Sequence, residues 1–131
     1  MTQQMYRDGA ALILKYNRDV ILLYRDNNPD LLYPNHWSLI GGGIEEDESP
    51  IEAAVRECQE EINITPLNVQ PLEIADFNGI KIHVFIGHYD SLDGICLNEG
   101  QAYGVFQPKA TLHLPLAFNA EDLLRRWVIE Q

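Results

Sequence analysis

One segment constrains the fold of this chain more than any other: residues 50–62, PIEAAVRECQEEI. Its apolar residues recur at spacings of four, three and four, which predicts an α-helix with one core-facing stripe. The helix has a clear start signal, with Ser49 as the N-cap and Pro50 at the first helical position. Asn63, which tolerates a left-handed conformation, and Pro66 predict its end. The predicted stripe consists of Ile51, Val55, Cys58 and Ile62, with Ala54 beside them.

Three glutamates of this helix form a separate face. At about 100° per residue, Glu57, Glu60 and Glu61 span about 100°, centred about 130° away from the apolar stripe. Carboxylates at this spacing repel one another by roughly 0.2–0.5 kcal/mol per pair. The negative end of the helix dipole disfavours each of them by a further ~0.3–1 kcal/mol. Something outside the helix should therefore offset this cost.

Hard divalent cations fit such an acidic face. Mg²⁺ prefers oxygen ligands, keeps several waters and is typically shared between carboxylates and substrate phosphates. The three glycines at 41–43 precede the helix and would let the backbone approach a metal ion and a phosphate closely. Because no Gly-Lys-Ser/Thr follows these glycines, the segment is not a P-loop.

The remaining segments predict strands on both sides of this helix. The first two β-prone runs are separated by Asn17-Arg18 and predict a hairpin, and the turn-rich segment 26–36 predicts a long loop. A closing helix is predicted at 118–130, with Asn119 as a candidate N-cap. We therefore expect one α+β domain over residues 1–131. The predicted strands are 10–16, 19–25, 37–40, 67–77, 80–90 and 102–107, with the glycines at 41–43 as a loop.

The charge distribution argues against some classes of function. A net charge of −11 argues against a basic surface for a nucleic-acid backbone, whereas a nucleotide held through a metal ion is compatible with it. No apolar run approaches the roughly 18 residues of a transmembrane helix, and the N-terminus, MTQQMYRDGA, lacks the layout of a signal peptide. Cys58 and Cys96 lack CxxC spacing and are interpreted as reduced thiols. We expect a cytoplasmic protein that binds neither nucleic acid nor membrane.

The residues from 42 to 64 resemble a known motif. Gly42, five residues, Glu48, seven residues and then Arg56-Glu57-Cys58-Gln59-Glu60-Glu61-Ile62-Asn63-Ile64 resemble the Nudix box, G-x5-E-x7-R-E-U-x-E-E-x-G-U, where U is bulky and apolar. The order of the flanking strands is also similar to the Nudix α/β/α sandwich, so the resemblance implies a mixed sheet between helices. The chain departs from the motif at four positions without deleting a metal ligand: Ile40, Asp47, Cys58 and Asn63.

The resemblance implies Mg²⁺-dependent hydrolysis of a nucleoside diphosphate linked to a group X, with Mn²⁺ as a substitute. Glu57, Glu60 and Glu61 would bind the metal ion, together with the Gly41 carbonyl. A further acid, Glu99, would complete the site. It lies in a Glu-Gly-Gln segment that recurs in MutT-like members. Arg56 and Glu48 would form the pair that supports the ligating face. The expected catalytic set is therefore Glu48, Arg56, Glu57, Glu60 and Glu61.

Four further residues are candidates for substrate binding. Arg25 lies where related enzymes place a phosphate-contacting base, and an ion pair with a neighbouring aspartate is its alternative role. Trp37 could line a base pocket or belong to the core. Phe118 could stack on a base or pack under the closing helix, and Asn119 could read a base edge or cap that helix. Loops 26–36 and 108–119 are expected to shape the pocket.

Several substrates remain open at this stage. The resemblance is closest to MutT-like enzymes that cleave a (d)NTP, or an oxidised (d)NTP, to a nucleoside monophosphate and pyrophosphate. ADP-ribose, nucleotide sugars and dinucleoside polyphosphates are the alternatives, because the box contacts only the diphosphate. A catalytically silent nucleotide-binding regulator on the same scaffold is the alternative of another class. Many relatives are dimers, so the resemblance also allows a homodimer.

Overall fold

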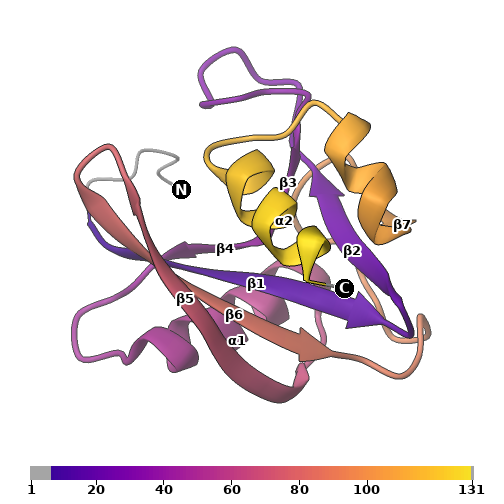
Figure 1. The fold of residues 1–131 in the computed structure, drawn as a ribbon, viewed down its shortest axis with the longest axis horizontal. Helices are drawn as coiled ribbons and strands as arrows, with labels where there is room; N and C mark the ends of the chain where they lie inside the picture. Colours follow the sequence, from indigo (N-terminus) through magenta and orange to yellow (C-terminus); the bar gives the residue numbers. More distant parts are fainter. Residues whose placement is uncertain (1–6, 131) are drawn as a thin grey trace.

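The computed structural model describes residues 7–130, which form a twisted sheet with helices around it (Figure 1). The first six residues lie outside the described part, so the prediction about a signal peptide falls largely on residues that the structure does not describe. In chain order the elements are β1 (Gly9–Tyr16), β2 (Asp19–Tyr24), β3 (Trp37–Ser38), β4 (Ile40–Gly43), α1 (Pro50–Ile62), β5 (Leu67–Phe77), β6 (Ile80–His88), β7 (Ala102–Phe106), the 3-10 helix η1 (Pro108–His113) and α2 (Ala120–Ile129).

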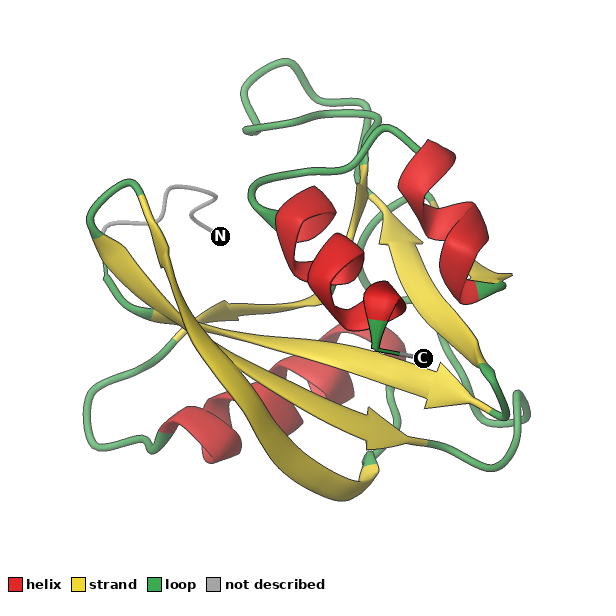
Figure 2. Cartoon of the chain, in the orientation of Figure 1, coloured by secondary structure: helices red, strands yellow, loops and turns green. Residues whose placement is uncertain are grey.

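The sheet is mixed. Its main path runs β3-β2-β1-β6-β5, with β4 paired to β1 and β7 paired to β2. Only the β1–β6 pair is parallel among the pairings described between named strands. On one side, strand β1 pairs with β4 along its first half and with β2 along its last three residues. Helix α1 lies on one side of the sheet and α2 on the other, which confirms the predicted α+β sandwich (Figure 2).

Two hydrophobic cores lie on the two faces of the sheet. Side chains of a strand alternate between faces, and β1 follows this rule: Leu12 and Leu14 belong to the core under α1, whereas Ile13 belongs to the core under α2. Strand β2 alternates in the same way, with Ile21 facing α1 and Leu22 facing α2. The apolar runs of these strands are therefore buried on both faces, as expected for central strands of a layered fold.

The predicted ends of α1 are confirmed. The Ser49 hydroxyl accepts a hydrogen bond from the Glu52 backbone N–H at 3.2 Å, and Glu52 Oε1 accepts one from the Ser49 N–H at 2.8 Å, which forms a capping box. At the other end, Asn63 adopts φ 65° and ψ 29°, and its N–H donates to Gln59 O at 3.0 Å. Asp47 also has a positive φ, 66°. Asn and Asp thus occupy left-handed positions where the motif has glycines.

The predicted core-facing stripe of α1 is wrong in its first half. Ile51 is 39% exposed and Val55 is only partly buried, whereas Ala53 and the predicted Ala54 are fully buried. Glu57 and Glu61 are buried on this helix as well, which brings the buried-residue list to Ala53, Ala54, Glu57, Cys58, Glu61 and Ile62. Small alanines and the facing glycines of β4 allow the helix to lie close to the sheet, so its buried face is rotated toward the glutamates.

The glycines at 41–43 form strand β4 rather than a loop. Gly41 and Gly42 pair with Ala11 and Ala10 of β1. A side chain at Gly42 would collide with the carboxylate of Glu57, so these glycines serve close approach between strand and helix. The predicted strand 37–40 is correspondingly interrupted at Leu39, and η1 appears in a segment that was predicted as loop.

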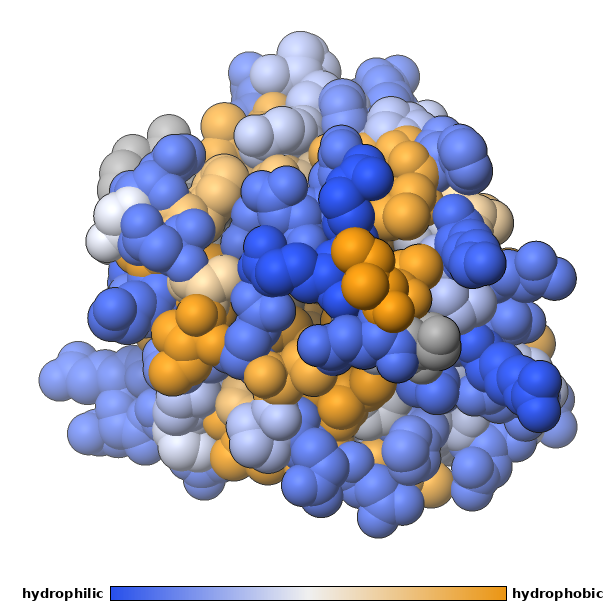
Figure 3. Space-filling model, in the orientation of Figure 1, coloured by the Kyte–Doolittle hydropathy of each residue, from blue (hydrophilic) through white to orange (hydrophobic). Residues whose placement is uncertain are grey.

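The chain carries a net charge of −11, and the face shown in Figure 3 is predominantly hydrophilic. On the face shown in Figure 3, hydrophobic residues form patches between larger hydrophilic areas. Across residues 7–130, every helix is too short or too polar to span a bilayer. Cys58 is buried, Cys96 is exposed, and both are free thiols, as predicted.

Candidate active site

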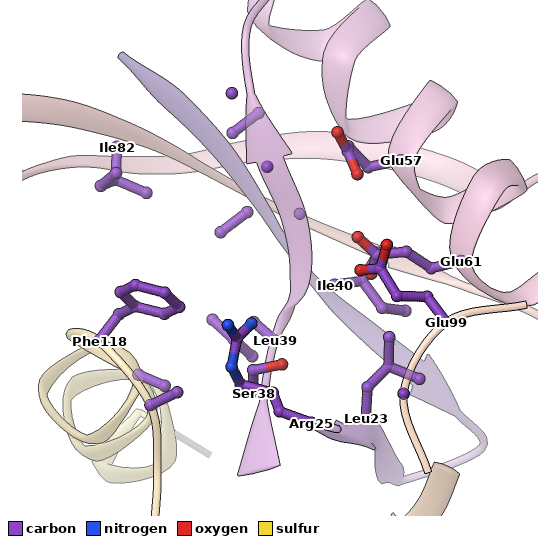
Figure 4. A pocket seen from close by; sticks show the side chains of 18 of the residues that line it. Leu23, Arg25, Ser38, Leu39, Ile40, Glu57, Glu61, Ile82, Glu99 and Phe118 are labelled. Carbon is purple, nitrogen blue, oxygen red and sulfur yellow. The ribbon is translucent and has the colours of Figure 1, made fainter. Parts of the chain in front are cut away.

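Most of the predicted site residues line one pocket of about 460 Å³. Its two ends differ in chemistry. Figure 4 shows Glu57, Glu61 and Glu99 on one side and Phe118 on the other, with Arg25 between them. The lining residues that were predicted from the sequence are Arg25, Gly41, Arg56, Glu57, Glu60, Glu61, Glu99, Phe118 and Asn119.

The acidic end contains carboxylates that face one another. Glu61 is only 3% exposed, and its pKa is raised well above the ordinary value, first by burial, then by a hydrogen bond with Glu57 and by the charges of Glu57 and Glu99. A backbone hydrogen bond from Gly41 acts in the opposite direction. The pKa of Glu99 is also raised, first by burial and then by the charge of Glu57. An added positive charge would stabilise the ionised forms of Glu61 and Glu99.

Arg56 places a positive charge beside Glu57 and Glu60 of α1. Its Nε donates to Glu48 Oε2 at 2.7 Å, and its Nη1 donates to both Glu57 Oε2 and Glu60 Oε1 at 3.0 Å. Its Nη2 also donates to the Gly43 carbonyl oxygen at 3.0 Å. The hydrogen bond from Arg56 lowers the pKa of Glu48 below its ordinary value. The expected Glu48–Arg56 pair is thus present, and Arg56 offsets the repulsion between the helix glutamates.

The donor set of this end suits a hard divalent cation, because it consists of carboxylate oxygens beside a strand of glycines. A further side chain at Gly42 would fill the space next to Glu57. Over the described residues, no group of three potential ligand side chains is already arranged to hold a metal ion. Arg56 holds one oxygen of Glu57 and one oxygen of Glu60 by hydrogen bonds. A divalent cation at these carboxylates would therefore share them with Arg56.

Arg25 lies between the two ends of the pocket. Its Nε donates to the carbonyl oxygens of Leu32 and Tyr33 at 3.0 and 3.1 Å, and its Nη2 donates to Leu32 O at 2.7 Å. Its guanidinium carbon lies 5.0 Å from the centroid of the Phe118 ring. Burial lowers the pKa of Arg25, while the charges of Glu99, Glu61 and Asp26 oppose this effect. Arg25 therefore connects the acidic end with the aromatic end and with the 26–36 loop.

Aromatic residues form the other end. The ring centroid of Phe118 lies 4.8 Å from that of Tyr33 and 6.1 Å from that of Phe77. Asn119 occupies the N-cap position of α2, but its side chain makes no capping hydrogen bond within the described chain. The capping role considered for this side chain is therefore wrong, and Asn119 lines the pocket instead.

Trp37 is not among the pocket-lining residues in the part of the chain that the structure describes. Its ring packs against Tyr24 and Phe106, with centroid distances of 4.9 Å in both cases. It also belongs to the residues packed against the core under α2. The binding role considered for Trp37 is therefore not supported, and its core alternative is.

Some lining residues were not predicted individually. Arg7, Ser38 and Ile82 reach the pocket from three separate segments, and no motif in the sequence connects them with the box. Asn28 and Leu31 belong to the 26–36 loop, which was expected to shape the pocket. Residues 117–120 of the second expected loop segment and its helix start also line it.

The chain is similar to curated and solved proteins. An RNA pyrophosphohydrolase of Psychromonas ingrahamii is 28% identical over 122 residues, which cover 86% of this chain and 67% of the relative. A dihydroneopterin triphosphate diphosphatase of Haemophilus influenzae is 31% identical over 67 residues, which cover 49% of this chain and 39% of the relative. The matches thus span about two thirds of the first relative's length and well under half of the second's.

The fold is shared with solved structures. A structure of MutT, from a study of the Aliivibrio salmonicida and Vibrio cholerae proteins, aligns with a TM-score of 0.80 at 21% identity, covering 95% of this chain and 98% of the other. At this identity the similarity shows the fold alone. The model of the NUDIX domain matches residues 5–125, which is most of the chain. With the box residues around one pocket, and with both sequence and fold in agreement, this chain belongs to the Nudix hydrolase family.

Proposed function

We propose that this protein is a Mg²⁺-dependent hydrolase of phosphoric anhydride bonds that cleaves a nucleoside triphosphate, a (d)NTP or an oxidised (d)NTP, to a nucleoside monophosphate and pyrophosphate. The observation that carries this proposal is the chemistry of the pocket described above. Carboxylates at one end suit a metal-bound polyphosphate, and Phe118 and Asn119 at the other end suit a planar, polar-edged ring.

Each group of residues has a distinct task in this proposal. Glu57, Glu60, Glu61 and Glu99 would hold the ion, with Mn²⁺ as a substitute and the Gly41 carbonyl as a further ligand. When bound, Mg²⁺ neutralises charge on the phosphates and activates the attacking water. Water attacks one phosphorus, the phosphorus–oxygen bond of the anhydride breaks, and pyrophosphate leaves with the bonding electrons.

The names of the two curated relatives support anhydride cleavage, and one of them specifies a small-molecule triphosphate. The other specifies RNA, but the net charge of −11 on this chain disfavours an extended contact with an RNA backbone. The pocket volume of about 460 Å³ is within the range of sites for one small ligand. A mononucleotide therefore fits the charge and the size of the site better than a polynucleotide does.

A hydrolysis screen tests the proposal. The panel contains dNTPs, 8-oxo-dGTP, ADP-ribose, nucleotide sugars, diadenosine polyphosphates and a 5′-triphosphorylated RNA, each with Mg²⁺ and with EDTA. We expect a nucleoside triphosphate to be the preferred substrate. In Glu60→Gln, turnover should fall about a hundredfold or more, because a metal ion contributes several kcal/mol to transition-state stabilisation.

Glu46→Gln is the matched control, since it makes the same chemical change at an exposed glutamate of the box segment that does not line the pocket within the described chain. Its turnover should match that of the wild-type protein. A Glu60→Gln variant as active as this control would contradict the metal site. Nucleotide binding without hydrolysis of any panel member would favour the silent regulator instead.

A further inference from the structure

The segment Glu99-Gly100-Gln101 connects the acidic end of the pocket with the 26–36 loop. Glu99 lines the pocket beside Glu57 and Glu61 (Figure 4), whereas Gln101 bonds to the loop. Gly100 makes this arrangement feasible. It has φ 88°, and a side chain there would lie 2.7 Å from the Tyr24 carbonyl oxygen. The Gln101 backbone N–H donates to that same oxygen at 2.7 Å, which fixes the segment against the end of β2.

The Gln101 side chain holds the two ends of the 26–36 loop together. Its amide nitrogen donates to the Arg25 carbonyl oxygen at 2.8 Å and to Asn35 Oδ1 at 2.7 Å. Arg25 and Asn35 lie at opposite ends of the loop, which follows β2 and returns to β3 at the top of Figure 1. Gln101 therefore closes the loop through contacts that are distant in the sequence, because it is 66 residues from Asn35.

The orientation of the Asn35 amide makes this contact specific. Asn35 Nδ2 donates to Asn27 Oδ1 at 2.7 Å, so its oxygen is directed to Gln101. The backbone N–H of Asn35 also donates to Asp26 O at 3.4 Å. Turning the Asn35 amide over would break its hydrogen bond with Asn27. A group at position 101 must therefore be a hydrogen-bond donor to satisfy both Asn35 and Arg25.

The inner side of the closed loop forms a wall of the pocket. Asn28 and Leu31 line the pocket directly, and the Tyr33 ring lies 4.8 Å from the ring of Phe118 at its aromatic end. Tyr33 has φ 53°, a conformation that is unfavourable for a large side chain. Its carbonyl oxygen accepts a hydrogen bond from Arg25, which helps to keep it there. The position of this wall thus depends on contacts at the loop ends.

We propose that Gln101 is a positioning residue that holds the 26–36 loop closed against the pocket and thereby determines how tightly the non-phosphate part of the nucleotide is bound. This inference rests on the proposed function for its kinetic consequence. Its structural part, that Gln101 orders the loop, stands independently. Gln101 acts through the loop and not on the reacting atoms.

Gln101→Glu is the sharpest test, because it keeps the length of the side chain and replaces the donor amide by a carboxylate facing two oxygen acceptors. Hydrogen exchange of the backbone amides, measured by mass spectrometry without nucleotide, reports on the loop directly. Amides of residues 27–35 should exchange roughly tenfold faster than in the wild-type protein, as expected for the loss of one or two hydrogen bonds. Exchange in β1 and β6 should stay unchanged.

Steady-state kinetics test the functional part on the substrate found in the screen. KM should rise roughly tenfold in Gln101→Glu, while kcat stays within about twofold, because the carboxylates at the acidic end are retained. Gln107→Glu is the control. It introduces the same charge at an exposed position whose side chain forms no capping hydrogen bond in the described structure.

The outcomes separate the two proposals. Wild-type exchange in the loop of Gln101→Glu would overturn the role of Gln101, whatever the enzyme hydrolyses. Faster exchange with an unchanged KM would show that the loop does not contribute to nucleotide binding, which also overturns it. A fall in kcat alone would assign Gln101 to the acidic end instead. If wild-type protein hydrolyses nothing in the panel, the proposed function fails while the exchange experiment still decides the loop. Gln101→Ala repeats the test should Gln101→Glu not fold.

Discussion

Arg56 Nε donates a hydrogen bond to Glu48 Oε2 at 2.7 Å, and both side chains are largely shielded from solvent, at 21% and 13% exposure. The same guanidinium reaches Glu57 and Glu60 through Nη1. The guanidinium of Arg56 thus bonds to Glu48 of the box loop and to two candidate metal ligands, Glu57 and Glu60. A metal ion at these ligands would share them with Arg56, whose closest carboxylate partner is Glu48.

Neutralising Glu48 should therefore weaken metal binding. In Glu48→Gln, Arg56 loses its closest carboxylate partner and is held more strongly by Glu57 and Glu60. We expect the Mg²⁺ concentration for half-maximal activity to rise about tenfold or more, as is typical when a residue that orients metal ligands is changed. A Mg²⁺ titration of hydrolysis rates measures this. Glu46→Gln should leave the titration midpoint unchanged, and an equally unchanged midpoint in Glu48→Gln would show that Glu48 does not affect metal binding.

The two aromatic candidates, Trp37 and Phe118, should respond differently to truncation. Trp37→Ala removes ring packing against Tyr24 and Phe106, so the free energy of unfolding should fall by about 2 kcal/mol or more, with KM nearly unchanged. Phe118→Ala should raise KM about tenfold, because stacking of a base on an aromatic ring contributes ~1–3 kcal/mol. Urea unfolding and steady-state kinetics on both variants test this contrast. A raised KM in Trp37→Ala at temperatures where it is fully folded would return Trp37 to the site.

Local sequence signals determined the parts of the fold that were predicted well. The α1 boundaries follow from the Ser49 cap and the Asn63 terminus, both of which act within a few residues. The strands β1, β5 and β7 follow from their apolar runs and turns to within about one residue at each end. The motif grouped Arg56, Glu57, Glu60 and Glu61, and all four line one pocket, because residues three and four apart on a helix lie on one face.

Features that depend on contacts distant in sequence were missed. The buried face of α1 is determined by how closely the helix lies to β4, which helical periodicity does not describe. The glycines of β4 have low strand propensity, but pairing with β1 outweighs it. Arg7, Ser38 and Ile82 enter the pocket only through the topology of the sheet. Most residues of the acidic end were thus predictable from the sequence, whereas the pocket walls required the structure.

Asn63 provides a test of the helix terminus. Its φ of 65° is tolerated by Asn and favoured by Gly but costs other residues about 1–2 kcal/mol. Asn63→Ala should therefore lower the free energy of unfolding by about 1 kcal/mol, while Asn63→Gly should be neutral or stabilising. Urea unfolding of the three proteins measures the differences. Equal losses in the Ala and Gly variants would mean that the Asn63 side chain, rather than its backbone conformation, is what matters.

The two cysteines should differ strongly in reactivity. Cys58 is fully buried in α1, and burial, with a smaller contribution from the charge of Glu61, raises the pKa of its thiol to about 12. Cys96 is exposed. With a thiol reagent such as DTNB at pH 8, the native protein should release one equivalent quickly and the second only on unfolding. Cys96→Ser should lose the fast phase. Rapid labelling of Cys58 in the folded protein would show that α1 opens locally far more often than its packing implies.

In the proposed function, Glu61 couples metal binding to stability. Its pKa is raised above the ordinary value of 4.5, so at high pH the metal-free fold must hold an ionised, buried carboxylate at a cost in stability. As pH falls through the raised pKa toward 4.5, the folded state takes up a proton before the unfolded state does, and the wild-type protein gains stability.

In EDTA, Glu61→Gln should therefore be more stable than wild type by about 1 kcal/mol or more at pH 8. That advantage should shrink as pH approaches 4.5, and Mg²⁺ should raise the Tm of wild type at pH 8 more than that of the variant. Thermal unfolding with and without Mg²⁺ across this pH range measures each quantity. A stability difference independent of pH would show that Glu61 is not the buried charge that the structure indicates.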